Sequence, residues 1–255
     1  MQFQSIKSLF LVLCASINVY CYSQAPTASS EIGIFIGDSY YRGELNKTHF
    51  TPFNLALGFF YRYNFDDRTA LKTSFNYGTI SGDDAISSNS FSQSRNFHFK
   101  SKIFELSTVF EFNFLEFSHL NDKGSPISPF IFIGLGYFYH NPQGGVGPVN
   151  VDLSTLQTEG RKYRKFQASI PLGLGLKFHE KRFGFSIEWG IRKTYTDYLD
   201  DVSAHYAVPQ NLENTGLSED LVNVQRGDVA TKDWLIFTGI TLFVNLNKNS
   251  QCRRP

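Results

Sequence analysis

The chain has 255 residues and a net charge of +1, with 42% hydrophobic and 16% aromatic residues. This near-neutral balance, without runs of like charge, excludes an electrostatic basis for binding nucleic acid, so no nucleic-acid partner is expected. Phenylalanine and tyrosine far outnumber methionine, which favours long β-strands over helices.

The N-terminus has the pattern of a secretory signal peptide. Lys7 is followed by an apolar run at residues 9–20 and then by polar residues. We expect cleavage after Ser23, so that residues 1–23 form the signal peptide and residues 24–30 a short linker. No later segment reaches the ~18 uninterrupted apolar residues of a membrane helix.

The three cysteines give no internal disulfide framework. Two of them, Cys14 and Cys21, leave with the signal peptide, and the large residues Leu13 and Tyr20 before them argue against lipidation. Only Cys252 remains in the mature chain. We expect an inert thiol in the tail, with an intermolecular bridge to a partner as the alternative.

Residues 53–64 carry the clearest strand pattern. Every second side chain from Phe53 is large and apolar, whereas most of the alternate set is small or polar. A period of two predicts a β-strand with a different solvent on each face. At ~3.4 Å per residue and a tilt of roughly 40°, about eleven residues rise ~28 Å, close to the ~25 Å apolar band of an outer-membrane barrel.

The same alternation recurs along the chain. It predicts eight strands at residues 31–41, 53–64, 69–79, 98–114, 128–139, 166–178, 183–192 and 232–246. We therefore expect an all-β, eight-stranded antiparallel transmembrane β-barrel of outer-membrane type at residues 31–246, with a periplasmic tail at residues 247–255.

The connections alternate between long and short. The first, third, fifth and seventh read as long loops, the last of them at residues 195–231, and the others as shorter turns. Outer-membrane barrels place long loops outside and short turns in the periplasm, so both termini are expected in the periplasm. Aromatic residues at both ends of the strands fit interfacial girdles, namely Tyr61, Tyr63, Phe112 and Phe178 below and Tyr77, Tyr137, Tyr139 and Trp234 above.

A soluble eight-stranded barrel of the lipocalin kind is the alternative fold. Its outer face would need many Lys and Glu residues for solubility. Here the face opposite the apolar one holds mainly Gly, Ser and Asn with scattered charge, which favours the membrane barrel.

Charged residues recur on the face predicted to line the lumen. Because eight strands enclose only enough space for side chains, we expect these residues to pair with each other as a structural network. A proton or ion path is the less favoured alternative. The set comprises Arg62, Lys72, Glu105, Glu111, Lys177, Glu188 and Arg192.

The chain lacks recognisable catalytic or cofactor motifs. No pair of its six histidines has metal-ligand spacing, so neither a metal nor a cofactor is expected. His140 or His98 with a loop serine would suit a lipid-modifying enzyme at the outer rim, which remains an alternative function. Residues 144–147 follow no strand-to-helix pattern and are interpreted as a flexible loop rather than a phosphate site.

An acidic segment follows the seventh strand. Its three carboxylates could attract a cation, but their spacing is not that of an EF-hand loop. A solvated acidic loop stem is the favoured interpretation. The segment comprises Thr196, Asp197, Tyr198, Leu199, Asp200 and Asp201.

The most distinctive segments are residues 31–37, 41–46, 128–136, 170–175 and above all 190–203, which runs from Gly-Ile-Arg-Lys-Thr to Thr-Asp-Tyr-Leu-Asp-Asp-Val-Ser. Together these segments resemble the PorG-like outer-membrane proteins of the type IX secretion system of Bacteroidota. The resemblance covers most of the mature chain, and no motif within it is catalytic.

The resemblance implies a non-catalytic barrel that anchors or contacts the periplasmic ring of the secretion machine. That ring is built from a lipoprotein and its soluble partner. We expect contacts at Lys181, Asp122 and Cys252, in the periplasmic turns and tail. A barrel outside the secretion system, such as a lipid-modifying enzyme, a small porin or an adhesin, remains the alternative.

Overall fold

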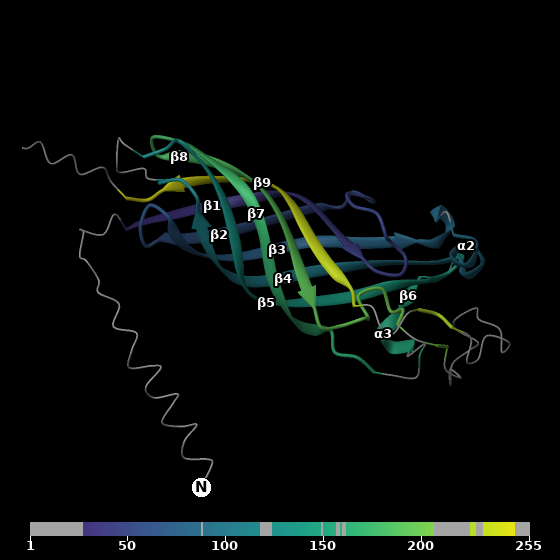
Figure 1. Cartoon of the computed structure of the whole chain (residues 1–255). Helices are drawn as coiled ribbons and strands as arrows, with labels where there is room; N and C mark the ends of the chain where they lie inside the picture. Colours follow the sequence, from purple (N-terminus) through teal and green to yellow (C-terminus); the bar gives the residue numbers. More distant parts are fainter. Residues whose placement is uncertain are drawn as a thin grey trace, which may run out of the picture.

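Eight long strands form the body of the molecule (Figure 1). The structure, a computed structural model, describes residues 28–87, 89–117, 124–148, 150–156, 159, 162–203, 205–206, 225–227 and 232–247. The strands are β1 (Ser29–Arg42), β2 (Leu55–Asn64), β3 (Thr69–Asp83), β4 (Phe97–Asn113), β5 (Ile127–Val146), β7 (Phe166–Glu180), β8 (Phe183–Thr194) and β9 (Trp234–Asn245). No helix in this part of the chain is long and apolar enough to cross a membrane.

These strands close into an antiparallel barrel. Each strand pairs with its neighbours along the chain, apart from the short β6 (Val151–Asp152), which is added to the outer part of β5. The first and last strands complete the ring, with β1 paired to β9 from Glu31 opposite Asn245 to Arg42 opposite Trp234. The predicted eight-stranded barrel is therefore confirmed.

The alternation of residues along each strand fixes which side chains face the lumen. On β2, Leu57, Phe59 and Tyr61 are exposed outside, whereas Phe60 and Arg62 are buried inside. The other strands repeat this arrangement, so the exterior is apolar and the core lies within the lumen. The polarity is the reverse of that of a soluble barrel.

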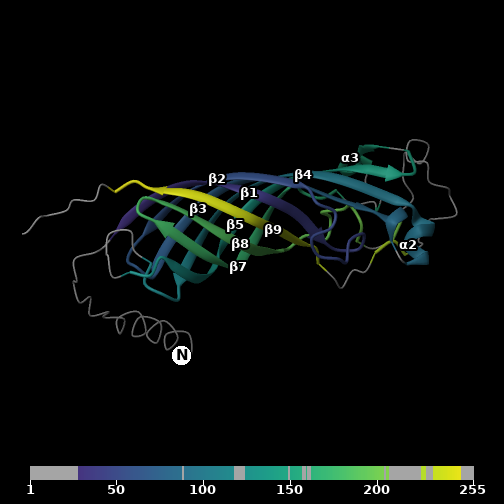
Figure 2. The same ribbon diagram turned by 90° about the horizontal axis from the view of Figure 1, so that it is seen from above.

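The two ends of the barrel differ (Figure 2). At the turn end, where Ala28 and Asn247 lie, the Asn247 side-chain amide donates to the Ala28 carbonyl over 3.0 Å. The connections at residues 65–68 and 181–182 lie there, together with residues 114–117 and 124–126, the described parts of the β4–β5 connection. At the loop end lie the 3-10 helix η1 (Asp84–Ile86), the helices α2 (Ser90–Arg95) and α3 (Leu153–Leu156), and β6.

The strands β3 and β5 continue further toward the loop end than the sequence predicts. The expected flexible loop at residues 144–147 is wrong for Gly144 to Val146, which belong to β5 and pair with β4. Gly144 permits this because a Cβ there would collide with the backbone of His98 and Phe99 on β4. Because β3 continues to Asp83, the β3–β4 connection is shorter than predicted. It has the same length as the β4–β5 connection at residues 114–126, which was expected to be the shorter of the two.

A hydrophobic cluster fills the lumen at the loop end. Leu199 and Val202 from the β8–β9 connection pack there with Leu153 of α3 and with inward side chains of the long strands, including Phe99 and Phe138. All five are almost fully buried. The connections thus contribute to the core instead of lying apart from the barrel.

Candidate functional site

A network of ion pairs crosses the middle of the lumen. Arg62 of β2 lies at its centre, 2.6 Å from the Glu31 carboxylate of β1 and 2.8 Å from that of Glu111 of β4. Lys177 of β7 reaches the same Glu111 over 2.6 Å and also donates to Asn113 over 3.0 Å. These four charged groups are fully buried.

Lys72 and Glu188 extend the network to the far wall. The Lys72 ammonium lies 2.7 Å from Glu188 on β8 and 3.3 Å from Glu111. Arg192, also on β8, pairs with Glu105 of β4 over 3.0 Å. All seven charged residues that the sequence analysis selected for the lumen therefore lie inside the barrel, and each pairs with an opposite charge there.

Glu31 is the network residue that the sequence analysis missed. Its carboxylate accepts from Arg62 and from the Asn64 amide, which is 2.9 Å away. With Glu31, the four network cations face four carboxylates. The sequence contained the signal for Glu31. Glu31 lies two residues before Gly33 and four before Phe35, so the alternation that places these two inside the barrel places Glu31 there as well.

Aromatic rings surround the cations and fill the space between them. The Arg62 guanidinium lies 4.9 Å from the Phe60 ring centre and 5.0 Å from that of Phe243, and the Lys177 ammonium lies 4.4 Å from that of Phe130. A cavity of about 30 Å³ beside Lys72 and Glu188 has room for one or two water molecules. This arrangement suits a rigid, electrically balanced plug rather than a solute path.

The acidic segment from Thr196 to Asp201 does not form a solvated loop stem. Asp197, Asp200 and Asp201 are almost completely buried, so that interpretation is wrong. The segment folds back over the lumen because Leu199 joins the hydrophobic cluster at the loop end. Tyr198 stacks on Tyr163 with ring centres 4.8 Å apart.

Two of these carboxylates have specific protein partners. Asp200 accepts from the Tyr41 hydroxyl over 3.1 Å and from the Val202 backbone amide over 2.9 Å. Asp201 accepts from the Tyr163 hydroxyl over 2.8 Å and pairs with Arg226 over 3.1 Å. Both carboxylates therefore fix the loop against the barrel.

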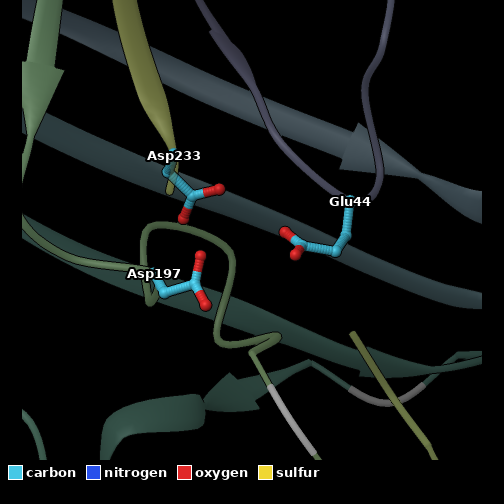
Figure 3. Close-up of side chains that lie close together, drawn as sticks. All are labelled: Glu44, Asp197 and Asp233. Carbon is cyan, nitrogen blue, oxygen red and sulfur yellow. The ribbon is translucent and has the colours of Figure 1, made fainter. Parts of the chain in front are cut away.

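Asp197 belongs to a third arrangement, in which three carboxylates converge (Figure 3). One oxygen from each of Glu44, Asp197 and Asp233 lies within 4.8 Å of the others. Glu44 comes from the β1–β2 connection, Asp197 from the β8–β9 connection, and Asp233 directly precedes β9. The sequence analysis identified only Asp197 of the three. The spacing of residues along the chain does not show that the first and last connections lie side by side.

Burial changes the protonation chemistry of this cluster. Removal from water raises the pKa of Asp233 well above its usual value, and the nearby carboxylates of Asp200 and Glu44 raise it further. Burial likewise raises the pKa of Asp197, although its hydrogen bond from Ser203 opposes the change. Because isolated buried anions are unfavourable, this cluster favours protons or a bound cation.

The two histidines considered as alternative catalytic residues lie at different positions along the β4–β5 pair. His140 is fully buried near the loop end, with its ring 5.9 Å from that of Tyr163 and its Nε2 atom 3.3 Å from the Arg164 carbonyl oxygen. His98 lies opposite Gly145 in the β4–β5 register, whereas His140 lies opposite Ile103.

The predicted partner contacts fall partly within the described structure. Lys181 is exposed in the β7–β8 turn, at the turn end. The neighbouring Arg182 carbonyl accepts from the Asn245 amide over 2.8 Å, close to the last described residues. Asp122 and Cys252 lie outside the described residues.

Comparison with known proteins gives one family and a set of barrels. A model of the family described as Domain of unknown function (DUF6089) matches residues 7–253. No curated protein matches the sequence.

Solved outer-membrane proteins resemble the fold at low sequence identity. Ail, the attachment invasion locus protein of Yersinia pestis, has 11% identity and a TM-score of 0.44, with 86% of this chain and 99% of that chain covered. Neisserial surface protein A has 10% identity and a TM-score of 0.42, with coverage of 85% and 97%. A major outer membrane protein from Thermus thermophilus has 13% identity and a TM-score of 0.41, with coverage of 86% and 99%.

Proposed function

The chain belongs to the DUF6089 family, and we propose that it is a non-catalytic outer-membrane barrel that anchors a protein assembly in the type IX secretion machinery. The single observation that carries the anchoring role is a closed lumen inside an apolar exterior. Such a barrel offers other molecules its two ends rather than a passage between them.

The exterior supports placement in a lipid bilayer. Apolar side chains are exposed around the ring, and Leu135 and Ile133 keep 74% and 58% of their surface open. A soluble protein rarely exposes such a continuous apolar surface. Other members of this outer set are Ile32, Ile34, Leu55, Leu57, Phe59, Leu71, Leu106, Phe110, Leu174, Phe185, Ile187, Ile240 and Leu242.

The lumen supports a role other than conduction. The Lys72–Glu188 and Arg192–Glu105 ion pairs span the interior, and the hydrophobic cluster lies above them. We expect no ion current when the purified barrel is inserted into planar lipid bilayers. Stable single-channel steps would contradict a closed barrel and favour a porin.

The buried position of His140 supports the proposal that the barrel is not an enzyme. Its ring is enclosed by Tyr163 and Phe138, away from the apolar exterior where a lipid substrate would lie. We expect His140→Ala and His98→Ala cells to keep the lipid profile of the parent strain by mass spectrometry. A changed acyl-chain composition would favour a lipid-modifying enzyme.

The partner in this proposal comes from the sequence resemblance to the PorG-like proteins. In the orientation expected from the lengths of the connections, the turn end, with Ala28, Lys181 and Asn247, faces the periplasm, and the long connections face the outside of the cell. The partner would be the periplasmic ring, made of a lipoprotein and its soluble partner. The exposed Lys181 is positioned to contact it.

Site-specific photo-crosslinking in intact cells tests the partner. A crosslinking residue at Lys181 should capture a ring protein, whereas the same residue at Lys47, exposed in the β1–β2 connection, should not. Asp122 and Cys252 serve as further positions for the same test. Capture of no ring protein, together with normal cargo secretion after gene deletion, would place the barrel outside the secretion machinery.

A further inference from the structure

Neither the fold nor the anchoring role explains why three carboxylates converge at the loop end. We infer that Glu44, Asp197 and Asp233 form a binding site for a calcium ion, which joins the first and last connections of the barrel. This inference does not depend on the partner of the turn end.

In each of the two aspartates, one carboxylate oxygen is hydrogen-bonded and the other is not, within the described part of the chain. The Oδ2 atom of Asp233 accepts from the Leu199 backbone amide over 3.0 Å, and that of Asp197 accepts from the Ser203 hydroxyl over 2.7 Å. Their Oδ1 atoms are buried and have no hydrogen-bond partner among the described residues. Only 1% of Asp233 and 3% of Asp197 is exposed, so bulk water does not solvate these oxygens.

An unpartnered buried carboxylate oxygen is costly and therefore unusual in a native protein. Here two such atoms belong to side chains that point toward each other and toward Glu44 (Figure 3). In each aspartate, the Oδ2 atom is bonded and the Oδ1 atom has no hydrogen-bond partner among the described residues, and Oδ1 of Asp233 lies close to Gly43, the residue before Glu44. Hydrogen bonding within the cluster does not explain this geometry, whereas a cation does.

The charges around the cluster also favour a bound cation. The nearby ammonium of Lys232 lies 3.7 Å from Asp197 Oδ2, but its side chain is 48% exposed. Asp200 adds a further buried carboxylate beside Asp233.

Ligand type favours calcium over magnesium. Calcium takes six to eight oxygen ligands at about 2.3–2.6 Å and is commonly held by several carboxylates. The three carboxylate oxygens lie within 4.8 Å of one another, so a single ion can contact all of them. Magnesium usually keeps several of its waters and is held by one or two carboxylates.

The site has an entrance. Glu44, Gly43 and Lys232 line a cavity of about 640 Å³ at the loop end. An ion and the waters that complete its coordination can reach the cluster from this side, because Glu44 is only half-buried. Binding would hold the end of β1 and the start of β9, the two strands that close the barrel, in a fixed relation.

Calorimetric titration of the full-length barrel tests this inference. The protein is purified in detergent, treated with EDTA, dialysed and titrated with CaCl₂, with MgCl₂ as the second arm. We expect saturable calcium binding that Asp233→Asn and Asp197→Asn each weaken at least tenfold. Asp152→Asn is the matched control, because Asp152 lies at the same end but pairs with Lys165 over 2.9 Å.

The thermal midpoint distinguishes a metal ligand from a merely structural aspartate. Without metal, Asp233→Asn should unfold at the same temperature as the wild type or higher, because a neutral amide removes repulsion. With calcium, the wild type should become the more stable of the two. Absence of calcium binding to the folded wild type, equal affinity in Asp233→Asn, or tighter binding of magnesium would each overturn the inference.

Discussion

The Lys72 ammonium lies 2.7 Å from a carboxylate oxygen of Glu188, although β3 and β8 stand on opposite sides of the ring of strands. A direct contact between opposite walls requires that the lumen hold no solvent column at this level. A barrel that is bridged in this way cannot pass solutes without rearrangement. The pair therefore supports the proposed role as an anchor rather than a channel.

Neutralising one member of this pair should destabilise the barrel. In Glu188→Gln, Lys72 keeps an ion pair only with Glu111, at 3.3 Å, among the described residues, and remains buried. Removal of one partner from a buried ion pair costs about 3–5 kcal/mol. We expect a decrease of that size in the free energy of unfolding, measured by urea titration in phospholipid vesicles.

Two further variants control that measurement. Glu116→Gln breaks an exposed pair with Arg68, in which both side chains are about half open to solvent, and should change stability by less than about 1 kcal/mol. Combining Lys72→Met with Glu188→Gln should cost less than the sum of the single changes. Additive losses would show that the two residues act independently.

The outer face should tolerate a charge only near its edges. Ile133 lies near the middle of the outward apolar series on β5, whereas Phe183 is the first residue of β8, at the turn end. An arginine on the lipid face costs about 2–4 kcal/mol at the bilayer midplane and about 0–1 kcal/mol near the interface. We therefore expect Ile133→Arg to reduce folding into vesicles much more than Phe183→Arg.

The reverse order would contradict a bilayer-spanning exterior. Equal tolerance of both charges in vesicles, with monodisperse protein in detergent-free buffer, would instead indicate a soluble barrel. The same pair of variants thus tests the orientation of the apolar face directly.

The strands could be predicted from sequence because the signal is local. A period of two in residues 53–64 specifies both the strand and its two faces, and it also places Arg62 inside. Extension of β5 to Val146 could not be predicted in the same way. It depends on pairing with β4, which carries the strand through a glycine-rich segment that reads as a loop.

The contacts between distant residues depend on the register of the closed barrel. Alternation places Lys72 and Glu188 in the lumen, but their pairing across 116 residues follows from strand order and stagger. The convergence of Glu44 and Asp233 has the same origin, because closure of β1 on β9 brings the two connections together. In both cases the sequence identifies faces, and the topology determines which side chains meet.

Gly43 provides a test of the carboxylate cluster without altering a carboxylate. A Cβ at this position would collide with Asp233 Oδ1 and lie 2.7 Å from a ring carbon of Tyr41. Gly43→Ala should therefore displace the unpartnered oxygen and weaken calcium affinity at least tenfold by calorimetry. Lys47→Ala, at an exposed position of the same connection, should keep the wild-type affinity.

The metal-free barrel should lose stability as the pH rises from 5 to 8. Burial and neighbouring carboxylates raise the pKa values of Asp200 and Asp233 well above 3.8 in the folded state. These two groups then bind more protons in the folded protein than in the unfolded chain over this interval, so their contribution to the free energy of unfolding decreases with increasing pH. Starting at pH 5 avoids most of the titration of carboxyl groups with ordinary pKa values.

Calcium should reverse that trend, because an ion competes with protons for the same oxygens and binds the ionised form. The groups that face Asp200 and Asp233 include Glu44, Asp197, Tyr41 and Arg95, and Lys232 pairs with Asp197. Urea unfolding at pH 5 and pH 8, with EDTA or with calcium, gives the four values needed. Asp233→Asn should flatten the EDTA series, and an EDTA series for this variant as steep as that of the wild type would contradict the assigned direction of the Asp233 pKa.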